Sequence, residues 1–178
     1  MIRPLANLLR RFRGSESGVS AVEFALIAPV MVLLYLGMVE ISMALSADRK
    51  VTNSASAIAD LVAQDDVITD AEMVNILDSS AAIIAPFDVA NYSVRISSVS
   101  MSLTGDVEVD WSDARGMVAR APGSQPGLPD GVLSAGRSVI WVEVFYDYEA
   151  PFREITGDFT IEEEFFLRPR QSLSVARD

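Results

Sequence analysis

Residues 18–40 read GVSAVEFALIAPVMVLLYLGMVE, an almost entirely apolar stretch. Within residues 19–47, the only charged side chains are Glu23 and Glu40. A helix over this range spans ~43 Å at a rise of ~1.5 Å per residue, which exceeds the ~30 Å hydrocarbon core of a bilayer. We therefore expect residues 19–47 to cross a membrane, with both glutamates near the interfaces. The alternative is a core helix of a soluble protein, which would need a domain large enough to surround it.

The charges on the two sides of this helix differ in sign. Residues 1–18 carry four arginines and one glutamate, whereas residues 48–178 carry 22 acidic and 10 basic side chains. Positive charge on a short flanking segment favours the cytoplasmic side of a membrane. We therefore expect a basic cytoplasmic leader (1–18), a transmembrane helix (19–47) and an acidic domain outside the cytoplasm (48–178).

The composition restricts the chemistry of the protein. The net charge is −11 and the external domain has no basic stripe, which argues against nucleic-acid binding. The chain contains no cysteine and no histidine. It therefore lacks disulfides, thiolate metal ligands and the commonest general base. We expect a protein that is not an enzyme and has no catalytic residue, no cofactor and no metal site.

Acidic residues recur along one expected strand, at Asp106, Glu108, Asp110 and Asp113. Gathered on one face, they could hold Ca²⁺, which prefers several carboxylate oxygens. However, Trp111 occupies the position where an EF-hand loop needs glycine. We expect a solvated strand face instead, opposite the apolar residues Val107, Val109 and Trp111. The run at 162–164 is likewise interpreted as solvent-facing charge rather than as a paired-carboxylate site.

Helical periodicity continues beyond the membrane segment. An apolar stripe with helical spacing comprises Val51, Ala55, Ile58 and Val62. We therefore expect a single helix from about Val19 to Gln64, whose second half forms the spine of the external domain. Thr69 and Glu72 have the spacing of a capping box, which predicts a second helix over residues 70–84.

Beyond Pro86 the apolar pattern changes to a period of two. This period predicts strands over residues 92–103, 107–111, 139–148 and 159–167. Residues 104–106 read Thr-Gly-Asp and predict a hairpin turn between the first two strands. Residues 114–137 are rich in glycine and proline and predict a long loop, either functional or merely mobile. An antiparallel sheet of about four strands, packed on the long helix, gives an α+β fold.

The segment from Gly18 to Leu26, which reads GVSAVEFAL, resembles the N-terminus of TadE-like proteins. These are the minor pseudopilins of tight-adherence (Tad/Flp) type IV pilus systems. The segment also fits the wider prepilin pattern of a short basic leader, a glycine, four further residues, a glutamate and an aromatic residue. Phe24 stands where major Flp-type pilins more often have tyrosine, whereas TadE-like proteins commonly read Val-Glu-Phe-Ala-Leu. The resemblance covers about residues 14–60.

The resemblance implies that a prepilin peptidase cuts after Gly18 and leaves Val19 as the new N-terminus. It also implies a bacterial inner-membrane location and a pilin-like domain in the periplasm. The implied partners are other pilins or pseudopilins and the inner-membrane pilus assembly machinery, and the implied process is adhesion. Glu23 would pair with the free amine of a neighbouring pilin, because paired charges in apolar surroundings cost less than lone ones. Alternatively, Glu23 is only a charge favoured by the helix dipole.

Two functions remain open from the sequence. The first is a structural pseudopilin that is processed after Gly18 and co-assembles through its N-terminal helix. The second is an uncleaved single-pass membrane protein whose external acidic domain binds other pilus-assembly or secretion components. The N-terminus of the mature chain distinguishes the two.

Overall fold

The computed structural model describes residues 17–154 and 156–178. The predicted leader therefore lies, up to residue 16, outside the described residues. The chain separates into two compact units, one that ends at Ser42 and one from Met43 to Asp178. Helix α2 runs through both units. The described helices and strands are α2 (Ser17–Gln64), β1 (Val67–Ile68), α3 (Asp70–Ile84), η1 (Val89–Asn91), β2 (Tyr92–Met101), β3 (Val107–Arg115), β4 (Ser138–Tyr148), β5 (Phe159–Leu167) and β6 (Ala176–Arg177).

Both predicted helices are confirmed. Helix α2 continues to Gln64, and its predicted apolar stripe is almost completely buried. The capping box starts helix α3, because the Thr69 side chain accepts a hydrogen bond from the Glu72 backbone N–H. In return, the Glu72 carboxylate accepts one from the Thr69 N–H at 2.8 Å. The hydrogen bonds that the Thr69 backbone N–H and hydroxyl donate to this carboxylate hold the pKa of Glu72 below its ordinary value.

The main sheet has the strand order β3-β2-β4-β5, and all neighbours are antiparallel. Strands β2 and β3 form the predicted hairpin, whose turn has Gly105 at φ +97°. Glycine fits here because a side chain rarely adopts a positive φ. The predicted α+β fold, with a long apolar helix, a second helix and a four-stranded antiparallel sheet, is confirmed.

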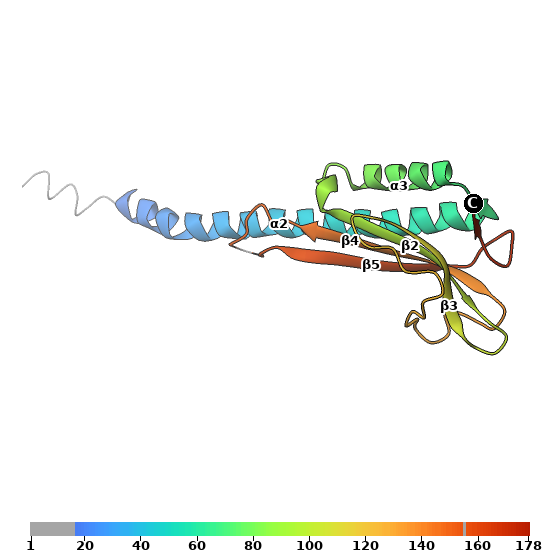
Figure 1. Ribbon diagram of the computed structural model, residues 1–178. Coiled ribbons are helices and arrows are strands. Elements are labelled where there is room, and N and C mark those ends of the chain that lie inside the picture. The colour runs from blue at the N-terminus through green and yellow to red at the C-terminus, as the bar shows by residue number, and fades with distance from the viewer. Residues whose placement is uncertain (1–16, 155) are drawn as a thin grey trace, which may run out of the picture. The chain divides into compact units, whose positions relative to one another are not determined.

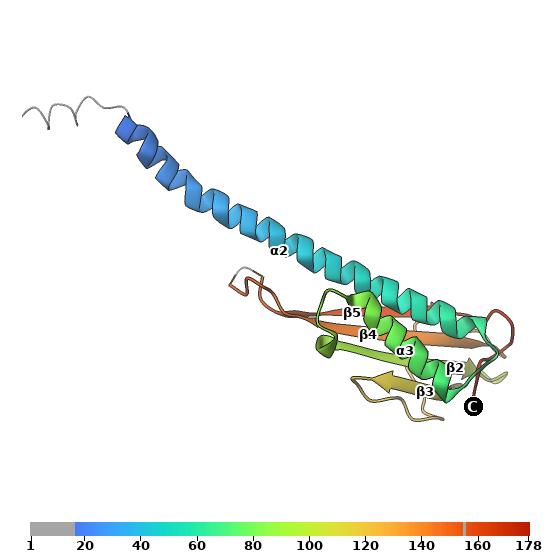
Figure 2. The same ribbon diagram turned by 90° about the horizontal axis from the view of Figure 1, so that it is seen from above.

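The larger hydrophobic core of the second unit lies between the helices and one face of the sheet. Residues 43–64 of α2 and helix α3 lie side by side over this face (Figures 1 and 2). Helix α3 contributes Met73 and Ile76, and the sheet contributes Ile96, Val142 and other alternate residues of β2 and β4. Strand β4 is central and is buried along most of its length.

The opposite face of the sheet carries a second, smaller core. It consists of Val99, Val109, Leu133, Val139 and Trp141. Leu133 belongs to the long loop, and Leu128 and Val132 of the same loop pack against the cluster. The loop, which the sequence left as either functional or mobile, therefore covers the outer sheet face with its own apolar side chains.

A β-bulge corrects one expectation from the sequence. Val109 and Trp111 were expected to share a face, because residues two apart on a regular strand point the same way. The register shifts, however, so that Ser98 lies opposite Trp111 and Val99 lies opposite Val109. The extra residue between Val109 and Trp111 reverses the alternation. Trp111 therefore joins the core under the helices, and Val109 joins the core under the loop.

The C-terminal segment forms a contact that the sequence did not predict. Strand β6 pairs in parallel with β1, which immediately follows helix α2. The Trp111 indole N–H donates to the Val175 carbonyl oxygen at 2.7 Å, and Arg177 pairs with Asp113. The end of the chain is thus tied to the edge of the main sheet.

Candidate functional site

The residues singled out by sequence lie at the start of α2. Gly18, Val19, Glu23 and Phe24 are all helical and exposed, and Phe24 is 72% exposed. Val19 and Glu23 are four residues apart, so they lie on the same face of the helix, separated by ~6 Å along its axis. The structure therefore brings the predicted new N-terminus and the predicted charge partner onto one stripe of a single chain.

The first unit exposes apolar side chains around the whole circumference of α2. The consecutive residues 30–35 are all at least half exposed, and six residues at 3.6 per turn cover every direction. A helix that is apolar all round requires lipid or other helices around it. Among the described residues, α2 is the helix long and apolar enough to cross a membrane. Glu40 is buried and has a partner, so Glu23 is the carboxylate that stands exposed on this surface.

Gly18 has no structural reason to be glycine in the described chain. A Cβ built at this position has no other atom within 4 Å, and the backbone has no positive φ there. Glycine within a helix costs roughly 0.5–1 kcal/mol relative to alanine, because it loses more backbone freedom on folding. Gly37, farther along α2, has equally open surroundings.

The strongest charged arrangement of the second unit lies on the outer face of the sheet. Glu143 is in the middle of β4, and its side chain is only 4% exposed. Arg95 of β2 donates two hydrogen bonds to the Glu143 carboxylate, each 2.7 Å long. Arg120 of the loop also pairs with this carboxylate, with one hydrogen bond of 2.9 Å and a second, shorter one. Both arginine side chains are largely buried as well.

This arrangement determines the charge state of Glu143. Burial alone raises the pKa of a carboxyl group, because it disfavours the charged form. The hydrogen bonds and the positive charges of Arg95 and Arg120 outweigh that effect and hold the pKa of Glu143 below its ordinary value. The carboxylate therefore stays ionised, and both of its oxygens accept hydrogen bonds from the two arginines. This arrangement suits a structural role rather than proton transfer.

Arg120 also anchors the long loop to the sheet. Its guanidinium carbon lies 3.7 Å from the ring centre of Trp141, which is a favourable cation–π position. Phe166 of β5 stacks on the same indole, with ring centres 5.5 Å apart. The loop is thus held by one buried ion pair and by the apolar contacts of the smaller core.

Three of the four acidic residues tested for metal binding have separate partners. Asp110 accepts hydrogen bonds from Ser98 and Ser100, and Asp113 pairs with Arg177. Asp106 accepts from Thr104 within the hairpin turn. Within residues 17–154 and 156–178, no group of three acidic side chains is placed to hold a metal ion. Each of these three carboxylates serves local structure.

Sequence reasoning missed the cluster around Glu143. One signal could have indicated it, because Glu143 is the single charged residue in the apolar run from Ser138 to Tyr146. A buried charge needs a paired partner. The sequence could not identify that partner, since Arg95 and Arg120 are 48 and 23 positions away from Glu143.

Comparison with known proteins gives one match. No curated protein and no solved structure matches the chain. The family model described as TadE-like protein matches residues 18–60, which include the membrane-length part of α2 and all four residues singled out at its start. The resemblance inferred from the sequence is therefore confirmed over residues 18–60, which are similar to the corresponding segment of TadE-like proteins.

Proposed function

We propose that this protein is a structural component of a Tad-type pilus, a minor pseudopilin that is processed after Gly18. In this proposal residues 1–18 face the cytoplasm, residues 19–47 cross the bacterial inner membrane, and residues 48–178 lie in the periplasm. The family match supports an association with Tad pili. The observation that carries the finer proposal is the surface of α2 before Met43, which is apolar on every side and exposes one carboxylate, Glu23.

That surface suits two successive environments. Lipid can surround it while the protein is in the membrane, and the helices of neighbouring pilins can surround it after assembly. The transfer needs no large change in solvation, because both environments are apolar. The partners in this proposal are other pilins or pseudopilins, the prepilin peptidase and the inner-membrane assembly machinery.

Cleavage after Gly18 would give Glu23 a specific partner. It creates a positively charged amine at Val19, which an apolar bundle strongly disfavours unless a carboxylate lies close by. Val19 and Glu23 are one helical turn apart on the same face, so a small axial shift between neighbouring subunits brings one chain's carboxylate to the other's amine. The pair would fix the stagger of adjacent helices during assembly.

Mass spectrometry of the purified full chain tests the processing step. In cells with a prepilin peptidase, we expect a mature chain that begins at Val19, and in cells without the peptidase we expect the intact chain. Gly18→Phe should block cleavage, because the residue before the cut would no longer be small. Gly37→Phe is the matched control, since Gly37 is equally free of neighbouring atoms and lies away from the cut.

Two results would contradict this proposal. An intact leader in peptidase-positive cells would support an uncleaved membrane protein whose external domain binds other assembly components. A cut after Ala47 would release the domain as a secreted protein and exclude both functions.

A further inference from the structure

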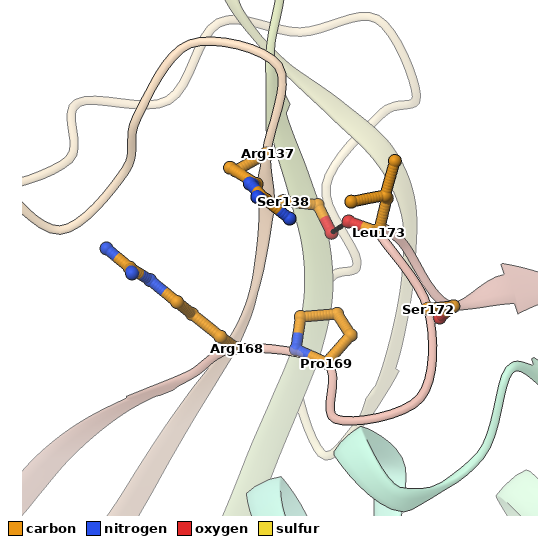
Figure 3. Close-up of a pocket in the computed structure, with 6 residues that line it drawn as sticks. All are labelled: Arg137, Ser138, Arg168, Pro169, Ser172 and Leu173. Carbon is orange, nitrogen blue, oxygen red and sulfur yellow. Dashed lines mark hydrogen bonds between the residues drawn. The ribbon is translucent and has the colours of Figure 1, made fainter.

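A polar pocket of about 300 Å³ lies at one end of the main sheet in the second unit. It is lined by Arg137, Ser138, Arg168, Pro169, Ser172 and Leu173 (Figure 3). Antiparallel pairing explains why these residues meet, because β4 begins where β5 ends and Ile140 lies opposite Leu167. Figure 3 shows the two arginine side chains on one side of the pocket and Ser172 and Leu173 on the other.

The pocket is at the end of α2 that is distant from the membrane-spanning segment in the sequence. The Arg170 N–H donates to the Ala63 carbonyl oxygen, and the Gln171 side chain donates to that of Gln64. These contacts place residues 168–173 at the C-terminal end of α2, about 25 Å along the helix axis from Ala47. Lipid headgroups around residues 19–47 are therefore poor candidates for its ligand.

The two pocket arginines differ from most arginines of this domain. Carboxylates pair with Arg95, Arg115, Arg120, Arg153, Arg170 and Arg177. Arg137 and Arg168, by contrast, have no ion pair and no side-chain hydrogen bond among the described residues. Residues 48–178 contain 22 acidic side chains against 10 basic ones, so an arginine without a carboxylate is unusual here. Arg49 on α2 is the remaining arginine of this unit without such a partner in the described chain.

Strand alternation places both guanidinium groups on the outer face of the sheet. Arg137 is two residues before Val139, and Arg168 is two residues after Phe166, and both of these apolar residues pack in the outer core. Ile140 lies opposite Leu167, so one residue farther along the sheet Arg168 lies opposite Val139. Arg137 is two residues from Val139, which makes the two arginines diagonal neighbours with about 7–8 Å between their Cα atoms. Like charges at this separation repel each other, and an anion bound between them would remove the repulsion.

The frame around these side chains is fixed although the guanidinium groups are free. The Ser138 hydroxyl donates to the Leu173 carbonyl oxygen at 2.8 Å. The Arg137 backbone accepts a hydrogen bond from the Met101 N–H and donates one to the Ser134 carbonyl oxygen. An anion would therefore be bound by side chains that stand on a rigid backbone, which reduces the entropy lost on binding.

Apolar side chains lie next to the two arginines. Leu173 is 63% exposed at the pocket itself, and Leu103 of the hairpin turn is 87% exposed. Leu103 lies beside Gly136, since a Cβ built on Gly136 would be 3.1 Å from its terminal methyl group. Exposed leucines beside unpaired arginines fit a ligand that is both apolar and anionic, such as a peptide, better than a free inorganic anion.

We propose that this pocket binds an acidic side chain from an extended segment of a partner protein. Arg137 and Arg168 bind the carboxylate, and guanidinium groups are suited to this by their paired donors. Leu103 and Leu173 pack against an apolar side chain next to the acidic one. The site does not depend on cleavage after Gly18, so the peptide experiment and the cleavage experiment test the two proposals independently.

A peptide titration of the full chain in nonionic detergent tests the site. The probe is the blocked peptide Leu-Glu-Glu-Leu, with Leu-Gln-Gln-Leu and inorganic phosphate as comparisons. We expect the Glu peptide to shift the NMR signals of the Arg137 and Arg168 side-chain N–H groups, and added salt to weaken this binding. Arg137→Gln or Arg168→Gln should lower the affinity at least tenfold, whereas the matched control Arg49→Gln should leave it unchanged.

Further variants distinguish a binding site from non-specific attraction. Arg168→Lys keeps the charge but loses the paired donors, so its affinity should lie between those of the native protein and Arg168→Gln. Neither arginine side chain has a hydrogen-bond or ion-pair partner among the described residues. The free energy of unfolding of these variants, measured by tryptophan fluorescence, should therefore match that of the native protein. The proposal is wrong if the Glu peptide causes no shift, if the Gln peptide binds equally well, or if Arg49→Gln weakens binding as much. Phosphate binding as tight as that of the Glu peptide would assign the pocket to small anions instead.

Discussion

Replacement of Glu143 by alanine is expected to lower the free energy of unfolding of the second unit, Met43–Asp178, by about 3–5 kcal/mol. The substitution leaves Arg95 and Arg120 without their shared carboxylate, although both arginine side chains are more than four-fifths buried. Two largely desolvated positive charges would then remain close together without a counter-ion. The loss should also loosen residues 116–137, because Arg120 is the charged anchor of that loop.

Urea unfolding of the full chain in detergent measures this effect. Both tryptophans lie in the second unit, and Trp141 contacts Arg120 directly. Their fluorescence therefore reports the unfolding of this unit. Glu164→Ala is the matched control, since Glu164 lies directly opposite Glu143 in the sheet but is exposed. We expect the control to change the free energy by no more than about 0.5 kcal/mol. Equal effects of the two substitutions would show that the buried cluster contributes nothing specific.

The stability contribution of Glu143 should also depend on pH. Its folded pKa lies below the ordinary value of 4.5. A carboxyl group with a lowered folded pKa stabilises the protein above its unfolded pKa, and this contribution is lost as the pH falls through the folded pKa. The difference in unfolding free energy between native protein and Glu143→Gln should therefore be constant near pH 7 and shrink below about pH 4.5. A difference that persists unchanged well below this pH would exclude the ionised carboxylate as its cause.

Glu23→Ala is expected to reduce incorporation of the protein into pili by a factor of more than 100. This prediction rests on the proposed pairing of Glu23 with the amine that cleavage creates at Val19. An unpaired buried charge costs about 3–5 kcal/mol, and each 1.4 kcal/mol changes an equilibrium tenfold. The measurement is the fraction of the protein recovered with sheared, purified pili relative to the membrane fraction.

Two controls separate assembly from other effects of Glu23→Ala. Glu108→Ala removes the same charge from an exposed position of β3 and should leave incorporation unchanged. The mass of the Glu23→Ala protein should still show cleavage after Gly18, since the glutamate acts after processing in this mechanism. If incorporation is normal, Glu23 is a helix N-terminal charge favoured by the dipole and has no role in stagger.

The elements of the fold were largely predictable because their signals are local. The apolar stripe of α2 and the capping box at Thr69 each involve residues within a few turns of one helix. The period-two segments predicted β4 and β5 with bounds within one residue of those observed. The turn at Gly105 was likewise specified by three consecutive residues. Local signals of this kind do not require knowledge of what lies opposite in space.

The strand faces were not predictable from the same pattern. The apolar residues of β2 change phase between Ile96 and Val99, and the sequence shows this change as an imperfect alternation. The structure shows that β2 alternates regularly, since it pairs with β4 without a shift, so Ile96 and Val99 lie on opposite faces. In β3 the bulge between Val109 and Trp111 makes the same change of face. The pairing of β1 with β6 was also missed, because strands of two residues carry no periodicity.

The candidate sites also differ in whether the sequence alone could predict them. The Gly18–Glu23 spacing is contiguous in the sequence, and the family match covers it. Its predicted processing and assembly roles stay predictions, which the experiments above address. The cluster around Glu143 and the pocket at Arg137 and Arg168 join strands and loops that are distant in the sequence. They became visible only through the register of the sheet.

The sequence by itself determined a long apolar helix with two glutamates, a second helix, four strands and their order along the chain. These follow from periodicity, capping and turn residues, all of which act over short distances. The tertiary structure alone decided which face each apolar side chain occupies, how the long loop is held and which arginines find a carboxylate. The physical reason is that burial and charge pairing depend on what lies across the sheet. For Glu143 the two partners are 48 and 23 residues away.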